Sequence, residues 1–177
     1  GARAMGYPFG DLYTLILFTG LRLREAAQAV WGEYQDAHEA LVLQPDRMKR
    51  KPGDERGAFL MPLNIGALVT IENMKDDLVG EDERPPADRP IFMGSRKSAV
   101  SGFSAAKVEL DDLIEEQIGH RLPHWTTHDL RRTMSTVLQP LGVTQKIIDR
   151  LQDHRDKEIS HTARHYQHYD YIDEKRA

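Results

Sequence analysis

Two short apolar runs, residues 41–43 and 58–61, differ from the helical patterns that dominate the rest of this 177-residue chain. A basic turn containing Pro52 and Gly53 separates the two runs, an arrangement typical of a β-hairpin. The chain has the length of one domain and can bury a sizeable core. The sequence therefore predicts an α+β fold that is mainly α-helical, with one small antiparallel sheet.

Apolar residues recur with helical period in most other segments. Residues 13–18 form an apolar run whose helix should end at Gly20, and residues 64–79 should form a helix that Asn64 caps. Residues 91–93 are a brief strand or part of a loop. The remaining predicted helices span residues 22–30, 101–118, 127–141, 144–151, 160–169 and 172–176.

The composition excludes several kinds of site. The chain has no cysteine, so it can form no disulfide, no thiolate nucleophile and no cysteine-based zinc site. No apolar run approaches the roughly 20 residues that span a bilayer, and no secretion leader is evident. We therefore expect a cytoplasmic protein without a membrane partner.

The distribution of charge is more informative than its sum. A net charge of −4 argues against a nucleic-acid-binding protein when taken alone. Basic residues are nevertheless clustered, at residues 47–51, 96–97 and 131–132. Local clusters create the field that a polyanion meets, so this distribution permits DNA binding on one face of the molecule.

The segment 127–133 carries an imidazole and two guanidinium groups within a predicted helix. His128 and Arg131 are three residues apart and would share one helical face. Arginine offers a planar fork of donors that matches two phosphate oxygens, and histidine can move a proton near neutral pH. This face is suited to a phosphodiester under attack, although a solvated amphipathic helix would show the same spacing.

Two further segments place basic side chains at positions suited to an anion. A glycine turn delivers Arg22 to the start of a helix, and Glu25 can brace its guanidinium. The alternative is a surface ion pair worth less than about 1 kcal/mol. In the hairpin, Lys49 could donate a proton to a leaving alkoxide, with Lys51 as a rival, or the turn could simply be charged.

The C-terminal tail is rich in histidine and tyrosine. His161, His165 and His168 follow helical spacing and could converge on zinc, but the chain has no HExxH motif and no interleaved carboxylate ligands. We therefore predict no metal site and no cofactor. Tyr166 is a candidate nucleophile, because nearby cations would favour its oxyanion.

The residues that carry this chemistry lie in an order that resembles the tyrosine recombinase (phage integrase) family: Arg22, Glu25, Lys49, His128, Arg131, His154 and Tyr166. The resemblance covers nearly the whole chain, and the segment 127–133 is its most specific part. Residues 45–49 and 166–176 look like those of P4-type prophage and genomic-island integrases.

The resemblance implies a role for each matching residue. Arg22 and Arg131 would clamp the scissile phosphate, and His154 would hydrogen-bond to it. His128 would assist proton transfer. Tyr166 would be the nucleophile that forms a 3′-phosphotyrosyl bond. Two arginines can supply the charge stabilisation that a metal ion gives elsewhere, which agrees with a metal-independent reaction.

The resemblance also assigns the hairpin. Lys49 would be the general acid toward the leaving 5′-oxygen. The remaining basic residues near these positions are expected to contact DNA: Arg47, Arg50, Lys51 and Arg132. One departure lies at residues 151–154, where Gln152 and Asp153 replace the small or Asn residues usual before the histidine. Asp153 is thus expected to bring a second acidic group near the phosphate.

By this resemblance, residues 6–177 would form the catalytic domain, and residues 1–5 would be a cloning scar or a disordered end. The core-binding and arm-binding domains of the family would lie outside this chain. The protein would integrate or excise a mobile element at double-stranded DNA attachment sites, in a bacterial cell or a phage-infected bacterium. It would act as a tetramer on DNA, whereas this chain alone would be monomeric.

Two other functions fit the same residues. A type IB topoisomerase shares this active-site logic but relaxes DNA without exchange between sites. A catalytically inert relic of the family would only bind DNA, although every expected catalytic position holds a competent residue type.

Overall fold

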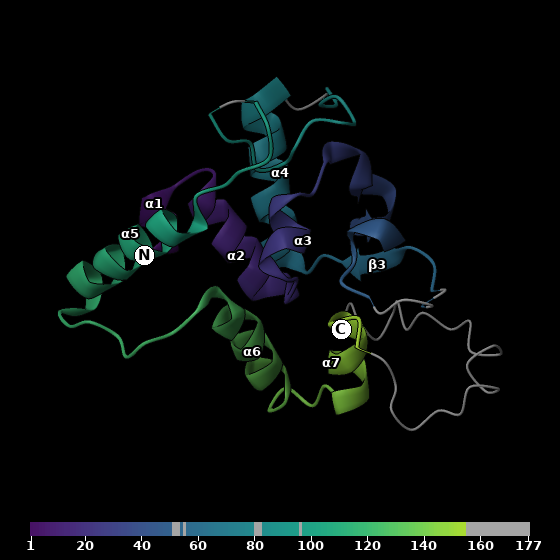
Figure 1. The fold of residues 1–177 in the computed structure, drawn as a ribbon. Coiled ribbons are helices and arrows are strands. Elements are labelled where there is room, and N and C mark those ends of the chain that lie inside the picture. The colour runs from purple at the N-terminus through teal and green to yellow at the C-terminus, as the bar shows by residue number, and fades with distance from the viewer. Residues whose placement is uncertain (51–53, 55, 80–82, 96, 155–177) are drawn as a thin grey trace.

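The computed structural model describes residues 1–50, 54, 56–79, 83–95 and 97–154 (Figure 1). The α-helices of this part are α1 (Ala2–Met5), α2 (Phe9–Thr19), α3 (Leu23–Ala27), α4 (Ile65–Val79), α5 (Phe103–Ile118), α6 (Thr127–Leu138) and α7 (Gln145–Leu151). The strands are β1 (Tyr34–Gln35), β2 (Ala40–Leu43) and β3 (Phe59–Pro62). The predicted helices at 160–169 and 172–176 lie outside the described residues.

The sheet is small and antiparallel, with the strand order β1-β2-β3. Within the hairpin, Ala40 pairs with Pro62 and Leu43 pairs with Phe59, which confirms the predicted pairing of the two apolar runs. The sequence did not predict β1, because a strand of two residues is too short to show an alternating pattern. The predicted class, mainly helical α+β with one small antiparallel sheet, is confirmed.

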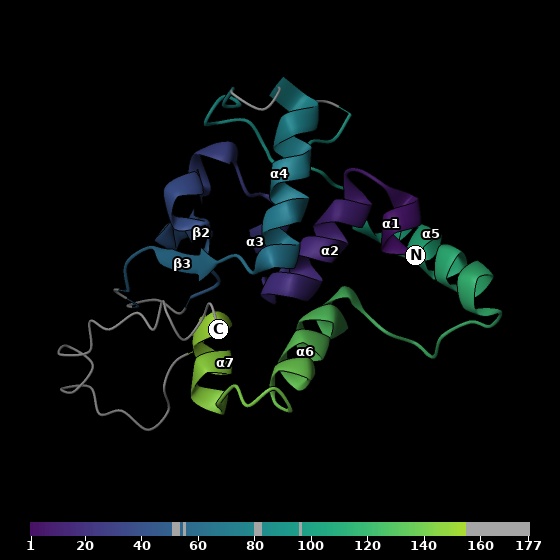
Figure 2. The same ribbon diagram turned by 180° about the vertical axis from the view of Figure 1, so that it is seen from behind.

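Helix α2 is the centre of the core. Its residues Leu12, Leu15 and Ile16 are almost completely buried, and the helix packs against α1, α4 and α6. Figures 1 and 2 show α4 on one side of α2 and α6 on the other. Because α2 contacts α6 and leads into α3, its C-terminal end brings the two arginine-bearing helices together.

Several helix ends follow the predicted signals. Gly20 ends α2 in the left-handed conformation, with φ of 67°, and its amide donates to Ile16 O at 2.8 Å. Asn64 caps α4, since its Oδ1 accepts the Ala67 amide at 3.0 Å. Thr144 is the N-cap residue of α7.

The start of α6 is held by a capping box. The Asp129 carboxylate accepts hydrogen bonds from the backbone amide of Thr126 at 2.8 Å and from its hydroxyl at 2.9 Å. These bonds, first that from the amide, lower the pKa of Asp129 to about 2. The first turn of α6, which includes His128, is therefore well fixed.

Two helices are shorter than predicted. Helix α3 ends at Ala27 rather than at Val30, because the following chain pairs with a distant segment: the Ile91 amide donates to Ala29 O at 2.8 Å. Isolated bridges in this region pair Val30 with Pro90 and Met93 with Ala99. Helix α6 ends at Leu138, and Pro140, which has no amide donor, follows shortly after.

Within the described part of the chain, none of the helices combines the length and apolar character needed to cross a bilayer.

Candidate active site

Arg131 lies at the junction of three segments. Its side chain is buried, with the residue only 3% exposed. One Nη1–H group donates to Gly20 O at 2.5 Å, and an Nη2–H group donates to Gln152 O at 2.5 Å. These carbonyls belong to the ends of α2 and α7, so the guanidinium is oriented by backbone groups rather than by a flexible side chain.

Arg22 lies at the N-cap position of α3 and is oriented by Glu25. The buried Glu25 carboxylate accepts the Arg22 backbone amide at 3.0 Å and the Arg22 Nη1–H at 2.6 Å. The brace predicted from the sequence is thus formed in the structure. About a quarter of the Arg22 side chain remains exposed, at 26%, so its guanidinium can still reach a ligand.

The two arginines share one electrostatic environment. Burial, and next the charge of Arg22, lower the pKa of Arg131 to about 10, while Glu25 and Asp153 act in the opposite direction. Arg131 stays protonated at neutral pH. Among the residues that the structure describes, no carboxylate forms an ion pair with it. The site therefore carries positive charge that an anion could neutralise.

His154 follows α7 and is placed beside Arg131, with its Nε2 3.4 Å from Arg131 Nη2. Its Nδ1 lies 3.4 Å from Asp149 Oδ1, and its backbone amide donates to Asp149 O at 2.8 Å. Since a guanidinium can only donate, Nε2 faces it as an acceptor, and Nδ1 carries the proton toward Asp149. Asp149 was not among the residues predicted from the sequence.

His128 lies exposed in the first turn of α6. Partial burial, and next the charges of Arg132 and Arg131, lower its pKa below the usual value, while Asp129 opposes the shift. A lowered pKa favours the neutral imidazole, so His128 is uncharged at neutral pH in the absence of DNA. In this state it can accept a proton or donate a neutral hydrogen bond.

We expect His128 to titrate below 6.5 in the free protein, in the pH dependence of its ring proton NMR signals. The variant Arg132→Gln should move this pKa upward, because it removes the largest cationic contribution. A phosphate-bearing DNA ligand should also raise it by adding negative charge. A pKa above 6.5 in the free protein, unchanged by Arg132→Gln, would contradict this account of the site.

Lys49 lies in the connection between β2 and β3, between two inward-facing neighbours. Met48 is buried and belongs to the hydrophobic core, and only 7% of the Arg50 side chain is exposed. The Lys49 residue itself is exposed. Met48 and Arg50 thus face the protein interior, and Lys49 between them is directed toward solvent.

Comparisons with known proteins identify the family of this chain. The model of the phage integrase family matches residues 9–172, which is nearly the whole chain. The chain belongs to the phage integrase family. A search of characterised protein sequences gave no significant match.

Solved structures show the same fold for this integrase-family chain at low sequence identity. The XerA recombinase matches with a TM-score of 0.63 and 14% identity over 97% of this chain and 58% of that one. The Tn1549 transposon integrase in complex with transposon right end DNA matches with a TM-score of 0.64 and 15% identity, over 85% and 53%. A lambda integrase dimer bound to a core site matches with a TM-score of 0.56 and 18% identity, over 89% and 41%. The chain thus spans about half the length of these structures.

Two of the expected DNA contacts have other partners in this integrase-family chain. The Arg47 guanidinium donates to a Glu33 carboxylate oxygen and, at 2.7 Å, to Glu25 O. Arg50 forms an ion pair with Asp153. These guanidinium groups are held by contacts within the protein, and DNA contact by Arg47 and Arg50 stays a prediction.

The other residues expected to contact DNA differ in what the structure says of them. Arg132 projects from α6, with 71% of its side chain exposed, and pairs with Asp129 at 2.8 Å. It remains available to a phosphate, because an exposed ion pair is weak. Lys51 and the proposed nucleophile Tyr166 lie outside the described residues.

Gln152 is a further residue of the site that sequence reasoning missed. It is buried, its backbone carbonyl accepts a hydrogen bond from Arg131, and its side chain amide donates to Ser135 Oγ at 2.5 Å. It joins the end of α7 to α6 and so fixes the position of the following histidine. The role of Gln152 depends on its burial, and the sequence alone does not show which residues are buried.

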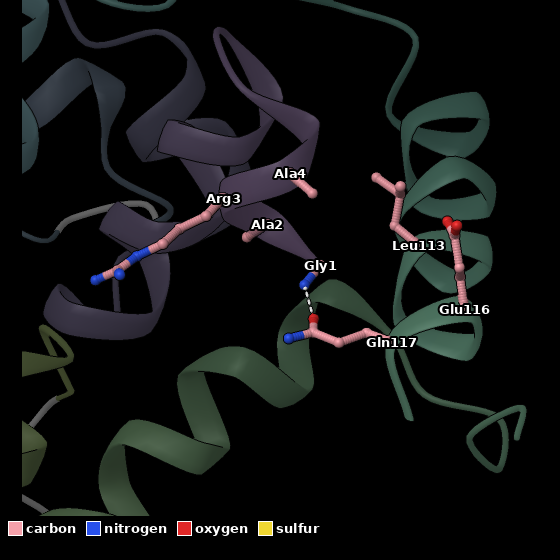
Figure 3. Close-up of a pocket in the computed structure, with 7 residues that line it drawn as sticks. All are labelled: Gly1, Ala2, Arg3, Ala4, Leu113, Glu116 and Gln117. Carbon is pink, nitrogen blue, oxygen red and sulfur yellow. Dashed lines mark hydrogen bonds between the residues drawn. The ribbon is translucent and has the colours of Figure 1, made fainter. Parts of the chain in front are cut away.

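A cavity of about 470 Å³ lies apart from these residues, between α1 and α5 (Figure 3). The Gly1 ammonium group donates to Gln117 Oε1 across it at 2.6 Å, and Arg3 points away from Leu113 and Glu116. The candidate active site lies elsewhere, where the ends of α2 and α7 meet Arg131. Within the described residues, no group of three or more histidine, aspartate or glutamate side chains could hold a metal ion.

Proposed function

We propose that this chain is the catalytic domain, residues 6–177, of a site-specific DNA recombinase that integrates or excises a mobile element. The observation that carries this proposal is the pair of arginines formed by Arg22, at the start of α3, and Arg131, on α6. Arg131 is buried and oriented by two backbone carbonyls, next to Arg22, without a carboxylate partner of its own among the described residues. Preorganised cations of this kind stabilise the charge that develops on a phosphoryl group during transfer.

The proposed reaction proceeds through a covalent intermediate. The phenolic oxygen of Tyr166 attacks the scissile phosphorus, a 3′-phosphotyrosyl bond forms, and the bond to the 5′-oxygen breaks. Lys49 donates a proton to that leaving oxygen. Attack by a 5′-hydroxyl on the phosphotyrosine reverses the steps and rejoins DNA without an external energy source. The charge stabilisation comes from protein side chains, so the proposed reaction is metal-independent.

His128 and His154 complete the proposed division of labour. The imidazole of His154 is oriented by Asp149 and lies beside Arg131, where it could bond to a phosphate oxygen. His128 lies at the start of the same helix as Arg131, and its lowered pKa suits a group that accepts and returns a proton.

The proposed partner is a double-stranded DNA attachment site. Solved relatives with the same fold include a site-specific recombinase bound to a difH substrate and an integrase bound to circular intermediate DNA. We propose that the full-length protein acts as a tetramer on DNA, that this chain alone is a monomer, and that its tail places it with the P4-type prophage integrases. The proposed location is the bacterial cytoplasm.

The test is to trap the covalent intermediate. The protein is incubated with supercoiled plasmid in EDTA and quenched with detergent, and protein-linked DNA is measured. We expect a covalent complex with the wild type and with Tyr169→Phe and Tyr171→Phe, and none with Tyr166→Phe, because a phenyl ring has no nucleophilic oxygen. Trapping that requires a divalent metal, or that survives Tyr166→Phe, would overturn the proposal.

A further inference from the structure

Asp153, directly before His154, makes contacts that its position in the sequence did not suggest. Its carboxylate is buried, with 6% of the side chain exposed, and it accepts hydrogen bonds from two arginines. Arg50 donates from Nε at 3.2 Å and from Nη2 at 3.3 Å, and Arg56 donates from Nη1 at 2.7 Å. The second acidic group expected beside the phosphate is therefore neutralised by arginines of the hairpin.

This cluster joins two segments that are far apart in the chain. Arg50 and Arg56 lie 103 and 97 residues before Asp153. Arg50 also donates to the carbonyls of Arg56 and Gly57, at 2.6 and 2.8 Å, so it crosses the connection between β2 and β3. The Asp153 carboxylate thus links both sides of the hairpin connection to the loop that carries His154.

The backbone of Asp153 suits this role. Its φ of 52° lies in the left-handed region, which aspartate and asparagine tolerate better than most residues. A glycine could adopt the same backbone conformation but would leave Arg50 without a carboxylate. A buried guanidinium that loses its partner is strongly unfavourable, because its charge is then uncompensated.

Lys49 lies next to the anchored residue. On its N-terminal side Met48 is held in the core, and on its C-terminal side Arg50 is held by Asp153. The Arg50 amide also donates to Met48 O at 2.8 Å, which closes a tight turn around Lys49. The conformation of the chain at Lys49 therefore depends on the ion pair that Arg50 makes.

We propose that Asp153 is a positioning residue that holds Lys49 at the reacting phosphate by fastening the β2–β3 hairpin to the loop before His154. This inference rests on the proposed function for the role of Lys49 as general acid. The hairpin anchor itself does not depend on that role. In this assignment, Asp153 supports proton donation without touching the DNA.

The first test measures the anchor without any DNA. The chain has no cysteine of its own, so two introduced cysteines are the only sites that a spin label can modify. Labels at Lys49→Cys in the hairpin connection and at the exposed Val137→Cys on α6 therefore report a single distance between these two segments. We expect a narrow distance distribution with Asp153 and a clearly broader one with Asp153→Asn, which keeps the size and the tolerated backbone conformation. The matched control is Asp149→Asn on α7, whose side chain contacts Gln145 and His154, and it should leave the distribution narrow.

The second test separates proton donation from phosphate binding. The cleavage position is mapped with the wild type, and an oligonucleotide is then made with a bridging sulfur in place of the 5′-oxygen there. A thiolate leaves without a general acid. We expect Asp153→Asn to slow cleavage of the oxygen substrate by about a hundredfold, the lower end of the range for general acid catalysis. On the sulfur substrate it should regain the wild-type rate, as should Lys49→Ala.

Each outcome decides a different claim. Equal distance distributions for wild type and Asp153→Asn would overturn the anchor. A broad distribution combined with an equal defect on both substrates would overturn the positioning of Lys49, because it would show a general loss of the site. If the wild type cleaves neither substrate, the proposed function fails, and the distance measurement still decides whether Asp153 fastens the hairpin.

Discussion

Replacing Arg131 with lysine is expected to lower the rate of covalent attachment to DNA by about a thousandfold. Removal of one preorganised donor to a developing charge typically costs 10²–10³ in rate. Lysine has a single ammonium group, which cannot reach the carbonyls of Gly20 and Gln152 and the phosphate in the geometry that the planar guanidinium holds. Two backbone carbonyls would also lose their buried donors, so the stability of the fold should fall.

The neighbouring residue provides the matched control. Arg132→Lys makes the same chemical change one position along α6, but this side chain is exposed and pairs only with Asp129 in the described structure. We expect the trapped DNA to fall less than about tenfold, in line with the small contribution of an exposed ion pair. Similar rates for the two variants would show that Arg131 has no special position in the site.

Gly20→Ala is expected to lower the free energy of unfolding by about 2–3 kcal/mol. Part of this cost is the left-handed backbone at Gly20, where φ is 67°, since a side chain there costs about 1–2 kcal/mol. The rest comes from overlap, because an added Cβ would lie 2.0 Å from Met134 Cε. This atom is the far end of a flexible side chain that can move, so the overlap should cost about 1 kcal/mol, the low end for overpacking a core. Met134 lies on α6, one turn from Arg131, so the shift should also reduce DNA cleavage.

Two comparisons isolate these causes in urea unfolding. Gly142→Ala introduces the same side chain at φ of 85° with nothing within 4 Å, and should cost only about 1–2 kcal/mol. In a Met134→Ala background, Gly20→Ala should cost about as little as Gly142→Ala does, because the overlap is gone. A Gly20→Ala protein as stable as Gly142→Ala, with full cleavage activity, would show that the contact with α6 is not tight.

Local signals were sufficient for much of the fold. The hairpin follows from two apolar runs around a turn, and the cap at Asn64 follows from a side chain that satisfies a free amide. The length of α3 could not be read in this way. The chain after Ala27 leaves the helix because it pairs with residues near 90, and such a partner has no trace in the local pattern.

In the candidate site, too, local spacing predicted some features, and contacts with distant residues determined others. Arg22 with Glu25, and His128 with Arg131, lie within one helical turn of each other, so their spacing alone predicted a shared face. Spacing alone could not show which basic side chains of residues 47–51 face the protein interior and which face solvent. Arg47 and Arg50 face the protein interior, where they pair with Glu33 and Asp153, respectively, whereas Lys49 is exposed. These carboxylates come from distant parts of the chain, so the local sequence does not reveal the pairs.

The most direct test of the central claim is to identify the amino acid that is joined to DNA. The trapped complex is digested with nuclease and trypsin, and the peptide 165–175, which contains Tyr166, Tyr169 and Tyr171, is sequenced by mass spectrometry. We expect a nucleotide linked through its 3′-phosphate to Tyr166, and a free 5′-hydroxyl on the other DNA end. A nucleotide on Tyr169 or Tyr171, a 5′-phosphate linkage, or no adduct at all would contradict the proposed mechanism.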